Sequence, residues 1–175
     1  MPASGDRFEM PDGSVYAVLK TSAETGGEFV EMEFALPPDC IPPPPHVHSH
    51  GVEEYEVIEG SFDVTVEGSW STLGPGESVS VPLGALHTFR NSTKSVVRVR
   101  NRHKPAMRFD EFIERMHTTL AEVGITRKRD PRVPLYLSTV MLEFPDTLVP
   151  GRKRDLIPMK ALAWLGRRLL ARKRG

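Results

Sequence analysis

Residues 45–60 read PHVHSHGVEEYEVIEG, and this stretch holds the strongest functional pattern in the chain. Three histidines, His46, His48 and His50, occupy alternate positions. On an extended strand, residues two apart share a face and lie ~6.6 Å from each other, so these imidazoles can project together. Imidazole is the commonest side-chain ligand for divalent transition metals, and the carboxylate of Glu53 follows closely. The pattern predicts a metal site built on a strand.

A second stretch, residues 76–91, reads GESVSVPLGALHTFRN and contains a further histidine. His87 follows a Pro-Leu-Gly turn at residues 82–84, and Phe89 shares its face of the strand. The alternative interpretation is that all these histidines are exposed loop residues after a proline run. That interpretation leaves the matching context of His87 unexplained, so we treat His87 as a fourth candidate ligand.

Short strand-like segments surround both stretches. In residues 28–36 (EFVEMEFAL), apolar residues alternate with glutamates, which is the period of a half-buried strand. Similar segments span residues 14–20, 53–59, 61–67, 70–73, 77–81, 87–91 and 95–102. Many short strands separated by Gly and Pro turns predict an all-β sandwich or barrel.

Strand parity also predicts the lining of this barrel. The residues expected to point inward are apolar or aromatic: Val30, Met32, Phe34, Leu36, Tyr55, Val57, Phe62, Val64, Val66 and Phe89. No Lys or Arg shares their face, because Arg98, Arg100 and Arg102 alternate with valines and should face outward. A molecule bound inside should be uncharged or aromatic; alternatively, these residues only fill the core.

The two stretches resemble the two motifs of the cupin superfamily, which has a double-stranded β-helix or jelly-roll fold. The first motif is G(X)5HXH(X)3–4E(X)6G, and its residues here are His46, His48, Glu53 and Gly60, with Cys40 in place of the leading glycine. The second motif is G(X)5PXG(X)2H(X)3N, which is met in full by Gly76, Pro82, Gly84, His87 and Asn91. The resemblance covers about residues 14–104 and implies a mainly β cupin barrel.

The resemblance also implies a ligand set for one divalent transition metal: His46, His48, Glu53 and His87. Fe²⁺, Mn²⁺, Ni²⁺, Cu²⁺ and Zn²⁺ all accept such ligands. Glu53 is the candidate catalytic residue, either as a ligand or, if it detaches, as a base. We interpret His50 as a rim residue or a donor behind the ligands. His103 and His117 lie outside the motifs, and we expect them at the surface or an interface.

A metal cupin of this kind is expected to act on a small, largely uncharged molecule of aromatic or polyketide-like character. Dioxygenation, as in quercetinase-like cupins, is the leading reaction. A metal-dependent isomerase or cyclase needs the same parts, and so does a non-catalytic binding cupin. A transcriptional regulator would need a recognition helix, and prolines interrupt the helical segments after residue 105.

The last part of the chain differs from the barrel segment. We divide the chain into a cupin barrel over residues 1–106 and a helical, basic extension over residues 107–175. Helical periodicity spans residues 109–123, a second apolar segment spans 134–144, and residues 157–174 are amphipathic. Leu162, Leu165 and Leu169 form a stripe in this last segment, which should pack on the barrel or on a second subunit rather than on a membrane.

Composition limits the remaining possibilities. The 175 residues include 23 Lys and Arg and 23 Asp and Glu, so no net field attracts nucleic acid. The charge is divided unevenly, because residues 1–106 carry 8 basic and 15 acidic side chains, and residues 107–175 carry 15 and 8. Cys40 is the only cysteine, which excludes an internal disulfide. The sequence shows no signal-peptide pattern and no apolar run of about 18–20 residues, so we expect a cytoplasmic protein. We also expect it to form a homodimer and to bind a small molecule.

Overall fold

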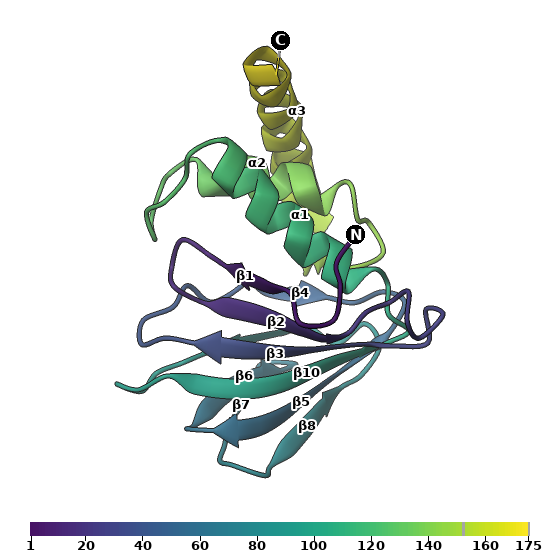
Figure 1. Ribbon diagram of the computed structural model, residues 1–175, viewed down its shortest axis with the longest axis vertical. Helices are drawn as coiled ribbons and strands as arrows, with labels where there is room; N and C mark the ends of the chain where they lie inside the picture. The colour runs from purple at the N-terminus through teal and green to yellow at the C-terminus, as the bar shows by residue number, and fades with distance from the viewer. Residues whose placement is uncertain (152, 175) are drawn as a thin grey trace.

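The computed structural model describes residues 1–151 and 153–174, which form two antiparallel sheets and three α-helices (Figure 1). The strands are β1 (Arg7–Glu9), β2 (Val15–Lys20), β3 (Val30–Leu36), β4 (His46–Val47), β5 (Val52–Glu59), β6 (Phe62–Val66), β7 (Ser69–Leu73), β8 (Ser78–Val81), β9 (His87–Arg90), β10 (Val97–Lys104) and β11 (Val149–Pro150). One sheet has the order β1-β2-β3-β10-β5-β8 and the other β11-β4-β9-β6-β7. The predicted mainly β jelly roll is confirmed.

The alternating segments became strands because one of their faces is buried between the sheets. In β3, the four apolar residues Val30, Met32, Phe34 and Leu36 are at most 1% exposed, while the residues between them are partly exposed. Two strands, β1 and β11, were not expected from the sequence, and β4 is shorter than the extended segment that the alternating histidines predicted. These strands have two or three residues each, which is too short for a period-two pattern to be recognised.

Strand register brings the two sequence motifs together. His46 on β4 lies directly opposite His87 on β9. Glu53 on β5 lies between Val81 on β8 and His103 on β10. Opposite residues of an antiparallel pair have their side chains on the same face, so the histidines of one sheet face the glutamate of the other.

Two motif residues that are not ligands have structural roles. Gly60 adopts a φ of +85°, and a Cβ at this position would lie 3.0 Å from Val97 Cγ2, so glycine suits the turn between β5 and β6. The Asn91 side chain donates to the carbonyls of Leu36 at 2.9 Å and Ser95 at 2.8 Å. Asn91 therefore ties the turn after β9 to the end of β3.

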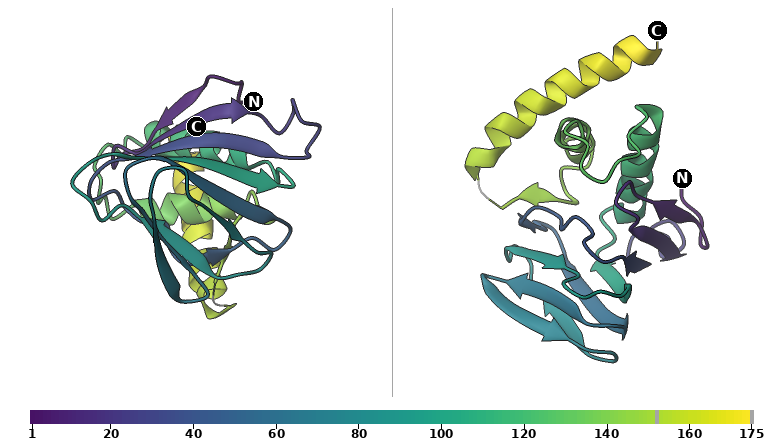
Figure 2. Two further views of the ribbon diagram at one scale, coloured as in Figure 1. Left: turned by 90° about the horizontal axis from the view of Figure 1, so that it is seen from below. Right: turned by 90° about the vertical axis from the view of Figure 1, so that its left-hand side faces the viewer.

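The helices gather at one end of the barrel (Figures 1 and 2). They are α1 (Phe109–Glu122), α2 (Val133–Met141) and α3 (Leu156–Arg174), with a 3-10 turn η1 (Lys153–Asp155) before α3. α1 packs on β1 and β3, α2 on α1, and α3 on α2. Between α2 and η1, β11 pairs with β4 and so adds a strand to the second sheet.

Within one chain, the leucine stripe of α3 does not pack on the barrel, and its packing on a second subunit stays a prediction. Leu162, Leu165 and Leu169 are 37–44% exposed, whereas Met159, Ala163, Gly166 and Leu170 are buried. Gly166 explains which face of α3 packs on α2. A Cβ at this position would lie 2.4 Å from Thr139 Oγ1, so glycine allows the two helices to approach closely. α3 then extends away from the barrel (Figure 2). Within the described residues, no helix is long and apolar enough to cross a membrane.

Candidate metal centre

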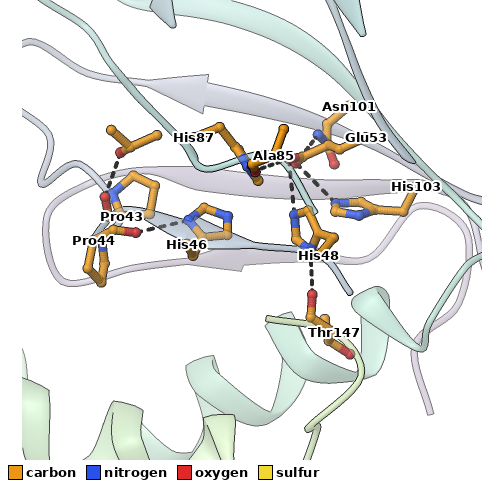
Figure 3. A network of polar contacts seen from close by, with 11 residues as sticks. Pro43, Pro44, His46, His48, Glu53, Ala85, His87, Asn101, His103 and Thr147 are labelled. Atoms are coloured by element: carbon orange, nitrogen blue, oxygen red, sulfur yellow. Dashed lines mark hydrogen bonds and ion pairs between the residues drawn. The ribbon is translucent and has the colours of Figure 1, made fainter. Parts of the chain in front are cut away.

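Four residues predicted from the motifs converge inside the barrel. Each of His46, His48, Glu53 and His87 offers one ligand atom, and these atoms all lie within 4.8 Å of one another. All four side chains are buried, with exposed fractions of at most 4%. Figure 3 shows the imidazoles of His48 and His87 directed toward the Glu53 carboxylate, with His46 beside them. Such a cluster could hold one metal ion.

Backbone carbonyls define the orientation of the three imidazoles. His46 Nδ1 lies 2.9 Å from the carbonyl oxygen of Pro44, and His87 Nδ1 lies 3.0 Å from that of Ala85. His48 Nδ1 contacts the carbonyl oxygen of Thr147. A carbonyl oxygen can only accept a hydrogen bond, so each Nδ1 carries the hydrogen. In the neutral ring, each Nε2 then has a lone pair for a metal.

These Nε2 atoms face a carboxylate, which also has only lone pairs to offer. Glu53 Oε2 lies 2.8 Å from His87 Nε2 and 3.1 Å from His48 Nε2. Two acceptors can approach this closely only if a cation, either a proton or a metal ion, lies between them. Within the described residues, His87 Nε2 is buried without a hydrogen-bond partner. The three imidazoles and one carboxylate therefore fit a divalent transition metal.

Electrostatics keeps His46 neutral and Glu53 ionised, as a metal requires, but favours a proton on His48. Burial and, to a lesser extent, neighbouring His87 lower the pKa of His46 to about 3, so His46 is neutral near pH 7. Burial opposes ionisation of Glu53, but His103 and His48 outweigh it and hold the pKa of this carboxyl well below its usual value. Burial also opposes protonation of His48, whereas the Glu53 charge raises the pKa of His48. A metal must therefore displace a proton between His48 and Glu53.

Two residues beside this cluster were missed in the sequence analysis. His103 was expected at the surface or an interface, and that prediction is wrong: its side chain is fully buried between the sheets and its Nε2 lies 3.2 Å from Glu53 Oε1. Asn101 Nδ2 donates to the same oxygen at 2.7 Å. The signal was available, because Asn101 and His103 continue the inward parity of Val97 and Val99 on β10.

The other histidines lie outside the cluster. His50 has a 60% exposed side chain, and its Nε2 lies 3.3 Å from Asp146 Oδ1, which matches a rim residue. His117 is half-buried on α1, where its Nδ1 lies 2.9 Å from the carbonyl oxygen of Glu9. Cys40 is buried, and desolvation raises the pKa of its thiol.

A cavity of about 180 Å³ adjoins His46 and Glu53. The barrel contributes Phe34, Tyr55 and Phe89 to its wall, as parity predicted. Much of the remaining wall was not predicted, because it comes from the extension: Phe109, Phe112, Ile113, Met116, Leu120, Val133, Leu137, Met141 and Leu148. The loop between α1 and α2 also contributes Lys128, so the cavity contains a cation that the barrel strands lack.

Comparison with known proteins agrees with the fold and the motifs. Residues 32–100 match the family model of the cupin domain, Cupin_2. This segment contains both histidine-bearing motifs and carries the similarity of the chain to the cupin superfamily.

More distant similarities concern parts of the chain. Mannose-1-phosphate guanylyltransferases of Escherichia coli (strain K12) and Salmonella typhimurium (strain LT2) are each 40% identical over 48 residues. That match covers 27% of this chain and about a tenth of the length of either relative. The structure of KdgF from Halomonas sp. is 18% identical, with a TM-score of 0.50, over 57% of this chain and 86% of that one. The polyketide cyclase RemF from Streptomyces resistomycificus is 27% identical, with a TM-score of 0.46, over 52% and 64% of the two chains.

Proposed function

We propose that this protein is a metal-dependent cupin enzyme, and that its reaction is dioxygenation of a small, largely apolar molecule of aromatic or polyketide-like character. One observation carries the proposal: three imidazole Nε2 atoms and one carboxylate oxygen meet at the edge of an aromatic cavity. A divalent metal bound there would supply Lewis acidity and, if redox-active, a path for electrons to dioxygen. The protein residues around it would bind and orient the substrate.

The cavity walls suit a planar, apolar substrate. Phe34, Phe89 and Phe109 lie near one another, with centroids of neighbouring rings 6.2–6.4 Å apart. Such rings bind flat molecules by stacking and exclude water from the reacting atoms. Asp12 also lines this cavity, where its carboxylate accepts hydrogen bonds from the backbone N–H groups of Ser14 and Ile41. Within the part of the chain that the structure describes, Lys128 makes no ion pair, so it can bind one acidic group of the substrate at the rim.

Tyr55 provides the polar group beside the proposed metal ligands. It lines the cavity, and burial, together with the Glu53 charge, raises the pKa of its phenol well above the usual value. The hydroxyl therefore keeps its hydrogen at neutral pH and can donate it to a substrate oxygen, but it does not serve as a base. Glu53, held as a carboxylate, is the acceptor for a substrate proton if a base is needed at this end of the cavity.

The test is metal content followed by oxygen consumption. Protein purified without a His-tag is analysed for metal, both as wild type and as His87→Ala, and is then loaded anaerobically with Fe²⁺. We expect about one redox-active metal per wild-type chain, loss of that metal in His87→Ala, and oxygen uptake with flavonols or other enolisable aromatics.

Other outcomes separate the alternatives. Stoichiometric zinc without oxygen uptake would contradict the dioxygenase reaction and would support an isomerase, a cyclase or a binding cupin. Absence of any metal under every loading condition would overturn the ligand assignment itself.

A further inference from the structure

The two oxygens of Glu53 have different partners. Oε2 faces His48 and His87, two of the proposed ligands. Oε1 faces away from them, toward Asn101 Nδ2 at 2.7 Å and His103 Nε2 at 3.2 Å. Figure 3 shows Asn101 and His103 gathered on this side of the carboxylate. Oε2 is therefore available to a metal, whereas Oε1 is held by protein side chains.

The backbone of β10 determines where these two partners lie. His103 is directly opposite Glu53 in the β5–β10 register, and Asn101 is two residues earlier on the same face. Both side chains are buried, with exposed fractions of 0% and 1%. The His103 ring also stacks on Phe109 of α1, with ring centroids 3.9 Å apart. Neither side chain can move far from Oε1 without disturbing a sheet or a helix contact.

The ring of His103 differs from those of the three proposed ligands in its hydrogen position. His46, His48 and His87 each place Nδ1 against a backbone carbonyl, which leaves Nε2 for a metal. Within the described residues, both ring nitrogens of His103 are buried and neither makes a well-aligned hydrogen bond. The acceptor that lies against the ring is Glu53 Oε1, next to Nε2. Because a buried N–H without an acceptor is costly, the ring hydrogen belongs on Nε2.

We propose that Asn101 and His103 are positioning residues that hold Oε1 of Glu53 and leave Oε2 as the single oxygen offered to the metal. This inference rests on the proposed metal site and deepens it. Both partners can only donate to Oε1, so the carboxylate is fixed in one orientation before any metal binds. Glu53 is thereby offered to a metal through Oε2 alone, because turning the carboxylate would break both contacts to Oε1.

The experiment compares His103→Phe, His103→Gln and Asn101→Leu with wild type. His103→Phe keeps a ring beside Phe109 but removes the donor, whereas His103→Gln restores an N–H near Oε1. Each protein is titrated with Cu²⁺, and electron spin echo envelope modulation counts the imidazoles bound to the copper. His117→Phe is the matched control, since it replaces a half-buried histidine on α1 away from Glu53.

We expect three coordinated imidazoles in every protein. Cu²⁺ affinity should fall about 10–100-fold in His103→Phe and Asn101→Leu and return to within about threefold of wild type in His103→Gln, as is typical for partners of metal ligands. The melting temperature of each metal-free variant identifies any general loss of folding. A role confined to packing would lower that temperature in His103→Phe without changing the copper affinity or spectrum of the folded protein.

Three results would overturn the proposal. Loss of one coordinated imidazole in His103→Phe would make His103 a ligand. Wild-type affinity in both His103→Phe and Asn101→Leu would show that Oε1 needs no partners. No copper binding by wild type would remove the metal site and this inference together. Copper binding without oxygen uptake by the iron-loaded protein would contradict only the proposed reaction.

Discussion

Both faces of the six-stranded sheet carry polar contacts of similar length to glutamate side chains. The contacts on the inner face are buried, and those on the outer face are exposed to water. On the inner face, Asn101 and His103 contact a Glu53 side chain that is 3% exposed. On the outer face, Arg100 Nη1 lies 3.1 Å from Glu56 Oε2, and these side chains are 43% and 46% exposed. Water screens the outer charges, while the inner carboxylate depends on its protein partners. The same strand, β10, therefore contributes to the site on one face and to exposed ion pairs on the other.

The cavity on the inner face and a depression on the outer face also differ in the polarity of their walls. The inner cavity has aromatic walls and adjoins the proposed metal ligands. An outer depression of about 340 Å³ is larger, but charged and small polar residues line it, among them Glu54, Arg100 and Arg102. A ligand there would compete with ion pairs already formed in water. The volume of a hollow therefore does not identify the site, whereas the convergence of buried metal-ligating side chains does.

Truncating a buried aromatic side chain on the inner face should have the largest effect on stability. Phe34 is 1% exposed and lies against Tyr16 with ring centroids 4.7 Å apart, so Phe34→Ala should lower the free energy of unfolding by about 3–5 kcal/mol. The matched outer change, Ser80→Ala, should alter it by less than about 0.5 kcal/mol. Urea unfolding in the presence of a chelator measures both. A loss below about 1 kcal/mol for Phe34→Ala would mean that the inner face is not packed as described.

Metal loading should stabilise the protein by an intermediate amount. At free metal 100 times above the dissociation constant, binding adds about 2.7 kcal/mol. For a protein of this size, the melting temperature should rise by roughly 5–10 °C, and a chelator should reverse the rise. Thermal scans with and without Ni²⁺ measure the shift. His87→Ala should abolish it and Arg100→Met should preserve it; equal shifts in both would show that the metal binds outside the inner cluster.

Much of this inner face was predictable because strand period and motif spacing are local properties. The positions of His46, His48, Glu53 and His87 follow from short stretches of sequence, and the structure brings all four together. His103 was misplaced although the evidence was equally local: it was judged by its absence from a motif rather than by its parity on β10.

Other features of the site could not be predicted from local patterns. The carbonyl that orients His48 belongs to Thr147, 99 residues away, and a backbone carbonyl has no side-chain signature. Lys128 reaches the cavity from a loop whose position depends on how α1 and α2 pack. The contact between α3 and α2 was not predictable for a related reason, since it depends on the close approach of two helices at Gly166.

Removing the single cation of the inner cavity should have a smaller effect, limited to ligand binding. Lys128→Met should weaken the binding of 2-naphthoate about tenfold and leave the binding of its neutral analogue 2-naphthamide unchanged. Fluorescence titration of metal-free protein measures both affinities, and Lys160→Met on α3 is an exposed control. Equal loss for the two ligands would assign Lys128 a packing role only. No loss for either would place the acidic group elsewhere.

The outer ion pairs should have the smallest effect of all. A double-mutant cycle with Arg100→Met and Glu56→Gln should give a coupling energy of about 0.2–1 kcal/mol, because both side chains are well exposed. The coupling should shrink further in 1 M salt, where the screening length is about 3 Å. Chemical unfolding of the two single variants, the double variant and wild type provides the cycle. A coupling above about 2 kcal/mol that persists in salt would contradict the contrast between the faces, since it would require the outer pair to be as shielded from water as Glu53 and His103.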